Sequence, residues 1–139
     1  MHCSAKATDW GAYIGLPYGN KGRGPDCFDC WGLVRWIAMQ ELGEEWPLYL
    51  DGYENAADRK EVAALAGEAA ASWKAIGEAG AQPFDVLLIR FGRFACHCGI
   101  VASDGEMLHI LRGINSTLER YKSPRWARRI EGAYRWQPQ

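Results

Sequence analysis

The stretch Gly24-Pro25-Asp26-Cys27-Phe28-Asp29-Cys30-Trp31-Gly32-Leu33-Val34-Arg35 decides how the chain folds. It predicts a loop that runs into the first turn of a helix, with Cys30 at that turn. Asp29 suits the helix N-cap, because its carboxylate can accept hydrogen bonds from the free N–H groups of the first turn. Apolar residues recur at helical spacing up to Gly43, which suits the helix end. The stripe that we expect to face the core comprises Trp31, Val34, Ile37, Ala38 and Leu42.

A cysteine at the N-terminus of a helix is open to two interpretations. The unpaired N–H groups and the positive end of the helix dipole favour the thiolate, which is the nucleophilic form. The same N–H groups can bind the oxyanion that forms when Cys30 attacks a carbonyl. Alternatively, Cys30 is a small buried apolar residue, as most free cysteines are. Gly32 would let another backbone or a ligand approach the helix closely.

Length and composition predict one globular domain over residues 1–139. Hydrophobic residues make up 48% and charged residues 24% of the chain, which is typical of folded proteins. A chain of this length can bury a core without disulfides. The five cysteines are an odd number, so we expect reduced thiols and synthesis in the cytosol.

The sequence shows no signal for export or for crossing a membrane. No run approaches the roughly 18 apolar residues of a spanning helix, and residues 1–10 lack the apolar core of a signal peptide. Residues 112–139 contain seven Lys or Arg residues against Glu119 and Glu131. Because these charges alternate with apolar residues, we expect them to dock an acidic protein partner and not a nucleic acid.

The order of expected elements is helices first and an antiparallel sheet afterwards, an α+β arrangement. We expect a helical segment over residues 7–16 with Trp10, Tyr13 and Ile14 inward, and a glycine-rich loop over residues 15–25. A second, peripheral helix without chemistry of its own is expected from an Asn55 cap to about Ala71. Strands are predicted at residues 73–76, 84–91, 96–102, 106–111 and 130–136, and residues 113–121 are expected to be irregular or one helical turn.

A nucleophilic cysteine needs a base, and the base needs a partner that orients it. His2 lies at the N-terminus and is set aside, so His97 and His109 are the candidates. A triad of Cys30, His97 and His109 requires both histidines to point to one face of the sheet. The alternative is that each histidine is merely half-buried on a strand.

The turn around residues 103–105 decides whether the two histidines share a face. A two-residue turn would pair Val101 with Leu108 and place the histidines on opposite faces. A three-residue turn would pair Ala102 with Glu106 and place them on the same face. Gly105 stands where the longer turn needs a left-handed residue, although the sequence allows both.

These motifs, in this order, resemble the NlpC/P-sixty peptidases of cell-wall peptidoglycan. The resemblance covers about residues 7–136 and rests on Leu16-Pro17-Tyr18, the glycine-rich loop, Asp29-Cys30-Trp31-Gly32-Leu33-Val34, His97-Cys98-Gly99-Ile100-Val101 and Leu108-His109.

The resemblance implies a papain-like α+β fold, with N-terminal helices packed on an antiparallel sheet. It implies hydrolysis of the amide between D-γ-glutamate and the diamino acid of the stem peptide, without a metal or cofactor. By position, Cys30 matches the nucleophile, His97 the base and His109 the orienting residue. Tyr18 matches a tyrosine that holds the substrate or oxyanion, and Asp29 an acidic residue that helps bind a free amino end.

Trp31 departs from many bacterial members, which have serine after the nucleophile, and we place it on the substrate side of the site. Together with residues 22–26 and 129–135, Trp31 resembles the subgroup from phage and prophage tails and gene transfer agents. The implied partners are tail-tip or hub proteins, and the implied location is a virion tail that acts in the target cell wall or periplasm. The main alternative is a structural tail protein whose peptidase site is masked.

A metal site is a further alternative, because Cys27-x-x-Cys30 and Cys96-His97-Cys98 contain typical zinc ligands. Alternate residues of a strand point to opposite faces, so Cys96 and Cys98 would face away from His97 and the three should not converge. A redox pair of Cys27 and Cys30 is disfavoured, since no thioredoxin-like βαβ unit surrounds it.

Overall fold

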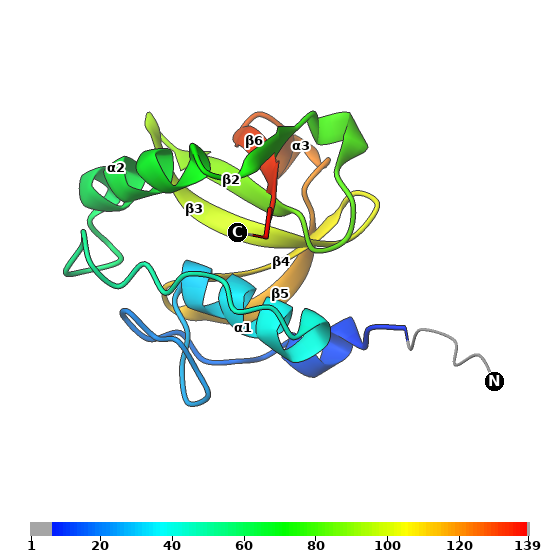
Figure 1. Ribbon diagram of the computed structural model, residues 1–139, viewed down its shortest axis with the longest axis horizontal. Helices are drawn as coiled ribbons and strands as arrows, with labels where there is room; N and C mark the ends of the chain where they lie inside the picture. The colour runs from blue at the N-terminus through cyan, green and yellow to red at the C-terminus, as the bar shows by residue number, and fades with distance from the viewer. Residues whose placement is uncertain (1–6, 139) are drawn as a thin grey trace.

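A six-stranded antiparallel sheet with the strand order β1-β6-β2-β3-β4-β5 forms the body of the fold (Figure 1). The computed structural model describes residues 7–138, apart from the side chain of residue 78. The helices are η1 (Trp10–Tyr13), α1 (Cys30–Leu42), α2 (Arg59–Ala70), η2 (Glu78–Gly80) and α3 (Pro124–Ala127). The strands are β1 (Lys74–Ile76), β2 (Val86–Phe91), β3 (Phe94–Ser103), β4 (Glu106–Leu111), β5 (Ile114–Arg120) and β6 (Ile130–Arg135).

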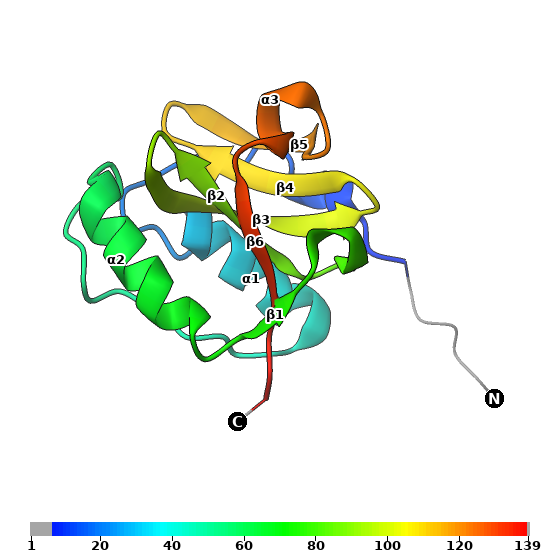
Figure 2. The ribbon, with the colours of Figure 1, turned by 90° about the horizontal axis from the view of Figure 1, so that it is seen from above.

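The sheet carries a hydrophobic core on each face, and the predicted α+β class is confirmed. On one face α1 packs with Leu33 and Ile37 against Ile100 and Leu108. On the other face Trp126 of α3 packs with residues such as Leu87 and Met107 (Figure 2). Within residues 7–138, none of the helices has the length and apolarity needed to cross a bilayer.

Helix α1 begins and ends as the sequence predicts. Asp29 Oδ1 accepts a hydrogen bond from the Gly32 N–H at 2.8 Å, and Gly43 ends the helix with a left-handed φ of 66°. Leu33, Val34, Ile37 and Ala38 are fully buried. Leu42 was expected in the buried stripe, but it is 41% exposed because it lies in the last turn, past the residues that pack on the sheet.

Three local predictions were wrong. Residues 7–16 form only the four-residue η1, and Ile14, which follows it, is 46% exposed. Helix α2 is capped by Asp58 and not by Asn55, because Asp58 accepts from the Glu61 N–H while Asn55 makes its own turn with the Ala57 N–H. Residues 114–120 form strand β5, paired with β4.

The β3–β4 hairpin combines features of both predicted turns. Ser103 pairs with Glu106, so the turn itself has two residues, as the first alternative expected. The register then shifts between Val101 and Ser103, and Val101 pairs with Met107. A β-bulge adds one residue to one strand, so the ladder beyond it has the register expected for the three-residue turn. His97 and His109 therefore share a face.

The glycine-rich loop and α1 touch backbone to backbone at Gly32. A Cβ on Gly32 would lie 1.8 Å from the carbonyl oxygen of Gly22. The expected close approach at Gly32 is thus made by another backbone. The loop residue Gly22 also accepts from the Asp29 N–H at 3.1 Å, which fixes the loop against the start of α1.

We expect Gly32→Ala to lower the free energy of unfolding by about 1–3 kcal/mol, because two backbones would have to move apart. The matched control is Gly67→Ala in the middle of α2, where nothing lies within 4 Å of the new Cβ. Gly67→Ala should be neutral or stabilise by up to about 1 kcal/mol through helix propensity. Urea unfolding followed by circular dichroism measures both, and equal stability of the two variants would contradict the close contact.

Candidate active site

Cys30, at the first position of α1, meets His97 and Cys98 of strand β3. Cys30 is partly buried, and all three residues line one pocket. Hydrogen bonding with Cys98 lowers the pKa of the Cys30 thiol to about 5; burial opposes this shift, and hydrogen bonding with His97 adds to it. Hydrogen bonding to Cys30 and burial raise the pKa of Cys98 well above its usual range, so Cys98 remains a thiol. The arrangement provides a thiolate at neutral pH, which is the nucleophilic form.

A β-bulge lets neighbouring residues of β3 reach the same site. His97 pairs with Ile89, but Arg90 pairs with Ala95, so the register passes over Cys96. Bulges bend a strand and re-aim its side chains. Cys96, His97 and Cys98 all contribute to the lining of the pocket.

His97 and His109 form a buried pair, and Glu119 completes a chain of hydrogen bonds. His97 Nε2 lies 2.9 Å from His109 Nδ1, and His109 Nε2 lies 2.6 Å from Glu119 Oε2. The two histidines are 4% and 1% exposed. Trp126 packs edge-on against His109 at a centroid distance of 5.0 Å, and its indole N–H donates to Glu119 Oε1 at 3.1 Å.

The ionisation of this chain of residues fixes which histidine nitrogens carry protons. Burial and the neighbouring His97 lower the pKa of His109 to about 4, so His109 is neutral at pH 7. Burial opposes ionisation of Glu119, but hydrogen bonds from Trp126 and His109 lower the pKa of its carboxyl group. Neutral His109 therefore donates from Nε2 to the Glu119 carboxylate and accepts at Nδ1 from His97 Nε2–H. This leaves His97 Nδ1 as the ring nitrogen available to Cys30.

Among the hydrogen-bonded residues His97, His109 and Glu119, Glu119 is the one that was not predicted from the sequence. His109 pairs with Thr117 across β4 and β5, so Glu119, two residues further on, faces the same side as His109. The missed signal was Arg112-Gly113, which forms a tight turn between the paired residues Leu111 and Ile114. A second hairpin there places Glu119 beside His109.

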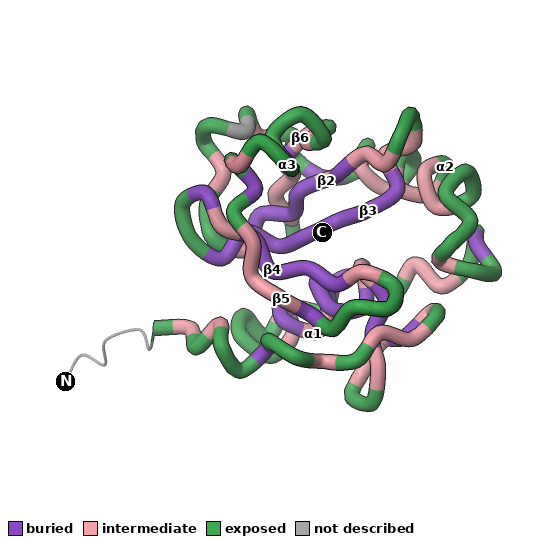
Figure 3. The backbone as a smooth tube through the Cα atoms, turned by 180° about the vertical axis from the view of Figure 1, so that it is seen from behind, coloured by how far each residue is buried: buried purple, intermediate pink, exposed green. Residues whose placement is uncertain are grey.

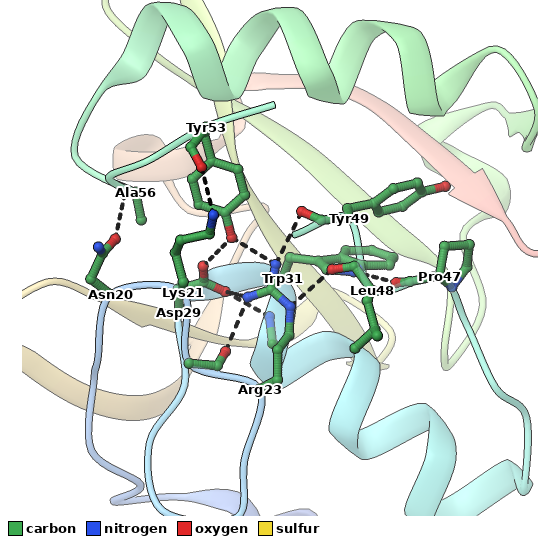
Figure 4. A network of polar contacts seen from close by, with 12 residues as sticks. Asn20, Lys21, Arg23, Asp29, Trp31, Pro47, Leu48, Tyr49, Tyr53 and Ala56 are labelled. Carbon is green, nitrogen blue, oxygen red and sulfur yellow. Dashed lines mark hydrogen bonds and ion pairs between the residues drawn. The ribbon is translucent and has the colours of Figure 1, made fainter. Parts of the chain in front are cut away.

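Asp29 is buried, and both of its carboxylate oxygens are engaged (Figure 4). Arg23 Nη1 donates to Oδ1 at 2.8 Å, beside the helix-cap bond from Gly32, and the Tyr53 hydroxyl donates to Oδ2 at 2.6 Å. The Arg23 guanidinium also donates to the carbonyls of Leu48 and Tyr49. The Asp29 network thus ties the glycine-rich loop and the segment before α2 to the start of α1.

Tyr18 and Trp31 are the two other residues that the sequence places beside Cys30. Tyr18 is half-buried, and burial together with the charge of Cys30 raises the pKa of its hydroxyl to about 12. Its hydroxyl is therefore a hydrogen-bond donor at neutral pH. Trp31 lines the pocket, where its indole N–H donates to the Pro47 carbonyl at 2.8 Å and its ring packs beside Trp73.

The metal interpretation gains no support from the part of the chain that the structure describes. There, no group of three or more His, Cys, Asp or Glu side chains is arranged to hold a metal ion. The described cysteines, at positions 27, 30, 96 and 98, are free thiols. His2, set aside above, lies outside the described residues.

Comparison with known structures agrees with the observed fold. The chain is similar to an NLP/P60 family protein from Staphylococcus aureus that is described as similar to lipoprotein. The two are 22% identical with a TM-score of 0.64, and the match covers 92% of this chain and 39% of that protein. It is 21% identical to the NlpC/p60 domain of the peptidoglycan hydrolase SagA, with a TM-score of 0.63, covering 91% and 92% of the two chains.

A Bacillus cereus protein of the same family is 21% identical, with a TM-score of 0.68, and the match covers 92% of this chain and 38% of that one. The chain thus spans about two fifths of the longer relatives. A search of curated protein sequences gave no match. The model of the NlpC/P60 family matches residues 15–135. The chain therefore belongs to the NlpC/P60 family.

Proposed function

We propose that the chain is a cysteine endopeptidase that hydrolyses the amide between D-γ-glutamate and the diamino acid of peptidoglycan stem peptides. The observation that carries this proposal is the Cys30 thiol in one pocket with His97, whose ring is hydrogen-bonded through His109 to Glu119. A thiol with a lowered pKa, a base and an ordered set of orienting groups are the parts that acyl transfer to cysteine needs. Membership of the NlpC/P60 family supports the choice of peptidoglycan as substrate.

The first half of the reaction forms a thioester. The Cys30 thiolate attacks the carbonyl carbon of the γ-glutamyl amide, and the carbonyl oxygen becomes an oxyanion. The N–H groups at the start of α1 and the Tyr18 hydroxyl are the donors for this oxyanion. His97 Nδ1, which took the Cys30 proton when the thiolate formed, then delivers this proton to the leaving amine of the diamino acid, and the C–N bond breaks.

The second half frees the enzyme. His97 Nδ1 takes a proton from water, which attacks the thioester and releases the γ-glutamyl carboxylate and the Cys30 thiolate. Throughout, His109 holds His97 Nε2–H by accepting its hydrogen bond, and Glu119 holds His109 in the tautomer that can accept. His109 and Glu119 act through His97 and not on the substrate.

The place of action that we propose is a phage-type tail tip, where the domain opens the target cell wall locally. The proposal rests on Trp31 after the nucleophile and on the sequences of residues 22–26 and 129–135, which resemble the tail subgroup. The basic C-terminal segment supports docking to an acidic tail or hub protein. The alternative, a structural tail protein with a masked site, predicts the same fold without cleavage by the isolated chain.

Cys30→Ala should abolish the release of stem-peptide fragments from purified peptidoglycan, at least about a thousandfold below wild type, because the nucleophile is lost. The matched control is Cys27→Ala, three residues earlier and outside the pocket lining, which should cleave like wild type. Mass spectrometry of the released peptides locates the bond that is cut. Equal cleavage by Cys30→Ala and wild type would refute the mechanism. No cleavage by the wild type, alone or with its tail partners, would favour the structural alternative.

Glu119→Gln should lower kcat by about 10²–10⁴-fold with a small change in KM, because an amide N–H facing His109 Nε2 favours the wrong tautomer. An unchanged circular dichroism spectrum should show that the fold persists. Glu106→Gln on the neighbouring strand is the matched control and should keep full activity. A change confined to KM would contradict an orienting role.

The rate of Cys30 alkylation should stay nearly constant from pH 8 down to pH 6 and fall below a midpoint at about pH 5. The sign follows from the lowered pKa, since the reactive thiolate persists until the pH drops below it; an ordinary thiol would lose reactivity below about pH 8.5. Cys98→Ala should move the midpoint toward neutral pH by removing the thiol that hydrogen-bonds to the thiolate. Cys96→Ala serves as the control. A wild-type midpoint near that of an ordinary thiol would contradict the assignment.

A further inference from the structure

The pocket beside Cys30 has mostly apolar walls. A polar stem peptide as substrate does not account for these apolar walls. Helix α2 forms one wall, with Leu65 and Ala66 among the residues that face the pocket. Trp31 and Trp73 contribute aromatic rings, and Leu88 of the sheet lies on the far side. Cys30 itself is part of the lining, so a group bound in the pocket can be joined directly to the carbonyl that Cys30 attacks.

Several polar side chains of the pocket lining are already paired with protein groups. Arg23, Asp29 and Tyr53 are hydrogen-bonded to one another, at 2.8 Å between Arg23 and Asp29 and 2.6 Å between Tyr53 and Asp29. The indole N–H of Trp31 donates to the Pro47 carbonyl, and that of Trp73 to the Tyr49 hydroxyl at 3.2 Å. Within residues 7–138, no buried side-chain nitrogen or oxygen lacks a hydrogen-bond partner. A polar ligand group entering the pocket would lose water and find few partners.

Helix α2 is placed as a wall and not as a core helix. None of its twelve residues, all of which are described, is buried (Figure 3). Its apolar residues Val62, Leu65, Ala66 and Ala69 face the pocket and are only partly covered. The expected peripheral position of α2 is confirmed, and the sequence reasoning did not foresee that its apolar side chains line the pocket. An apolar ligand in the pocket would cover this stripe and gain the corresponding transfer free energy.

We propose that the pocket binds an apolar group carried by the carbonyl that Cys30 attacks, so that the chain hydrolyses apolar acyl esters and amides. The inference rests on the proposed function only in using Cys30 as the nucleophile. The Cys30 thiolate bonds to the acyl carbon, the C–O or C–N bond breaks, and the alcohol or amine leaves with a proton from His97. Water then cleaves the thioester to the carboxylic acid. The apolar group is either a fatty acyl chain or the large apolar side chain of an acyl-side residue.

A series of p-nitrophenyl esters tests the proposal on the full chain. The octanoate should have a kcat/KM at least about tenfold above the acetate, because each buried methylene contributes up to about fourfold. The p-nitrophenyl esters of N-acetylphenylalanine and N-acetylglycine distinguish a fatty acyl chain from an apolar side chain as the bound group. A preference for octanoate over acetate identifies a fatty acyl chain. A preference for the phenylalanine ester over the glycine ester, without a preference for octanoate, identifies a side chain. If neither ester is preferred by at least about threefold, the proposal is overturned.

Filling the pocket gives a matched pair of variants on one helix. Ala66→Phe places a ring into the pocket, and the octanoate-to-acetate ratio should fall at least about fivefold. Ala64→Phe places the same ring on the exposed side of α2, away from the pocket lining, and should leave the ratio unchanged. Circular dichroism checks that both variants are folded. An unchanged ratio in a folded Ala66→Phe chain would overturn the proposal.

The two proposals fail separately. Peptidoglycan cleavage with a flat ester profile overturns the apolar pocket and leaves the endopeptidase proposal intact. Preference for octanoate without peptidoglycan cleavage supports the pocket and counts against the endopeptidase. A preference for octanoate that persists in Cys30→Ala would overturn the apolar-pocket proposal, and peptidoglycan cleavage that persists in Cys30→Ala would overturn the endopeptidase proposal.

Discussion

The hydrogen bonds of the buried Asp29 carboxylate hold the site together. One oxygen accepts from the Gly32 N–H of α1 and from Arg23 of the glycine-rich loop, and the other accepts from Tyr53. A buried charge without such partners would cost several kcal/mol. Three chain segments must therefore meet for Asp29 to be buried, and their meeting places Cys30 at the helix end. The family resemblance implies that Asp29 helps to bind the free amino end of a substrate peptide. Both oxygens of the Asp29 carboxylate already accept hydrogen bonds from the protein, so such an amino group would have to share them.

The chemistry of Cys30 depends on pairings across three strands. The β-bulge at the β3–β4 turn puts His97 and His109 on one face, and the β4–β5 ladder adds Glu119. Because His109 is buried and its pKa is lowered to about 4, it stays neutral and relays orientation from Glu119 to His97. A shift of either ladder by one residue would turn a member of this chain to the opposite face. Strand register is thus part of the catalytic apparatus that we propose.

The pocket beside Cys30 and the hydrogen-bonded chain behind it make different demands on a substrate. In our proposals, the hydrogen-bonded set of His97, His109 and Glu119 serves the acyl transfer, whereas the pocket selects what is attached to the acyl carbon. Several polar side chains of the pocket are hydrogen-bonded within the protein, and indole rings and apolar side chains of α2 form much of the remaining surface. Reaction type and substrate preference would then reside in separate parts of the domain.

The sequence by itself determined the α+β class and the start and end of α1, and it singled out Cys30, His97 and His109 as candidate site residues, because these follow from local rules such as capping, periodicity and residue type. It did not determine the face on which the histidines lie, since a bulge changes the register by one residue without a clear local signal. Glu119 was missed because it lies on β5, whose many polar residues hide the alternation typical of a strand. Its place beside His109 follows only from the pairing of β5 with β4. The approach of α2 to Cys30, which makes a half-apolar surface helix into a pocket wall, was decided only by tertiary packing. Contacts between segments distant in the chain depend on how whole layers pack, and such packing is not encoded within any single stretch.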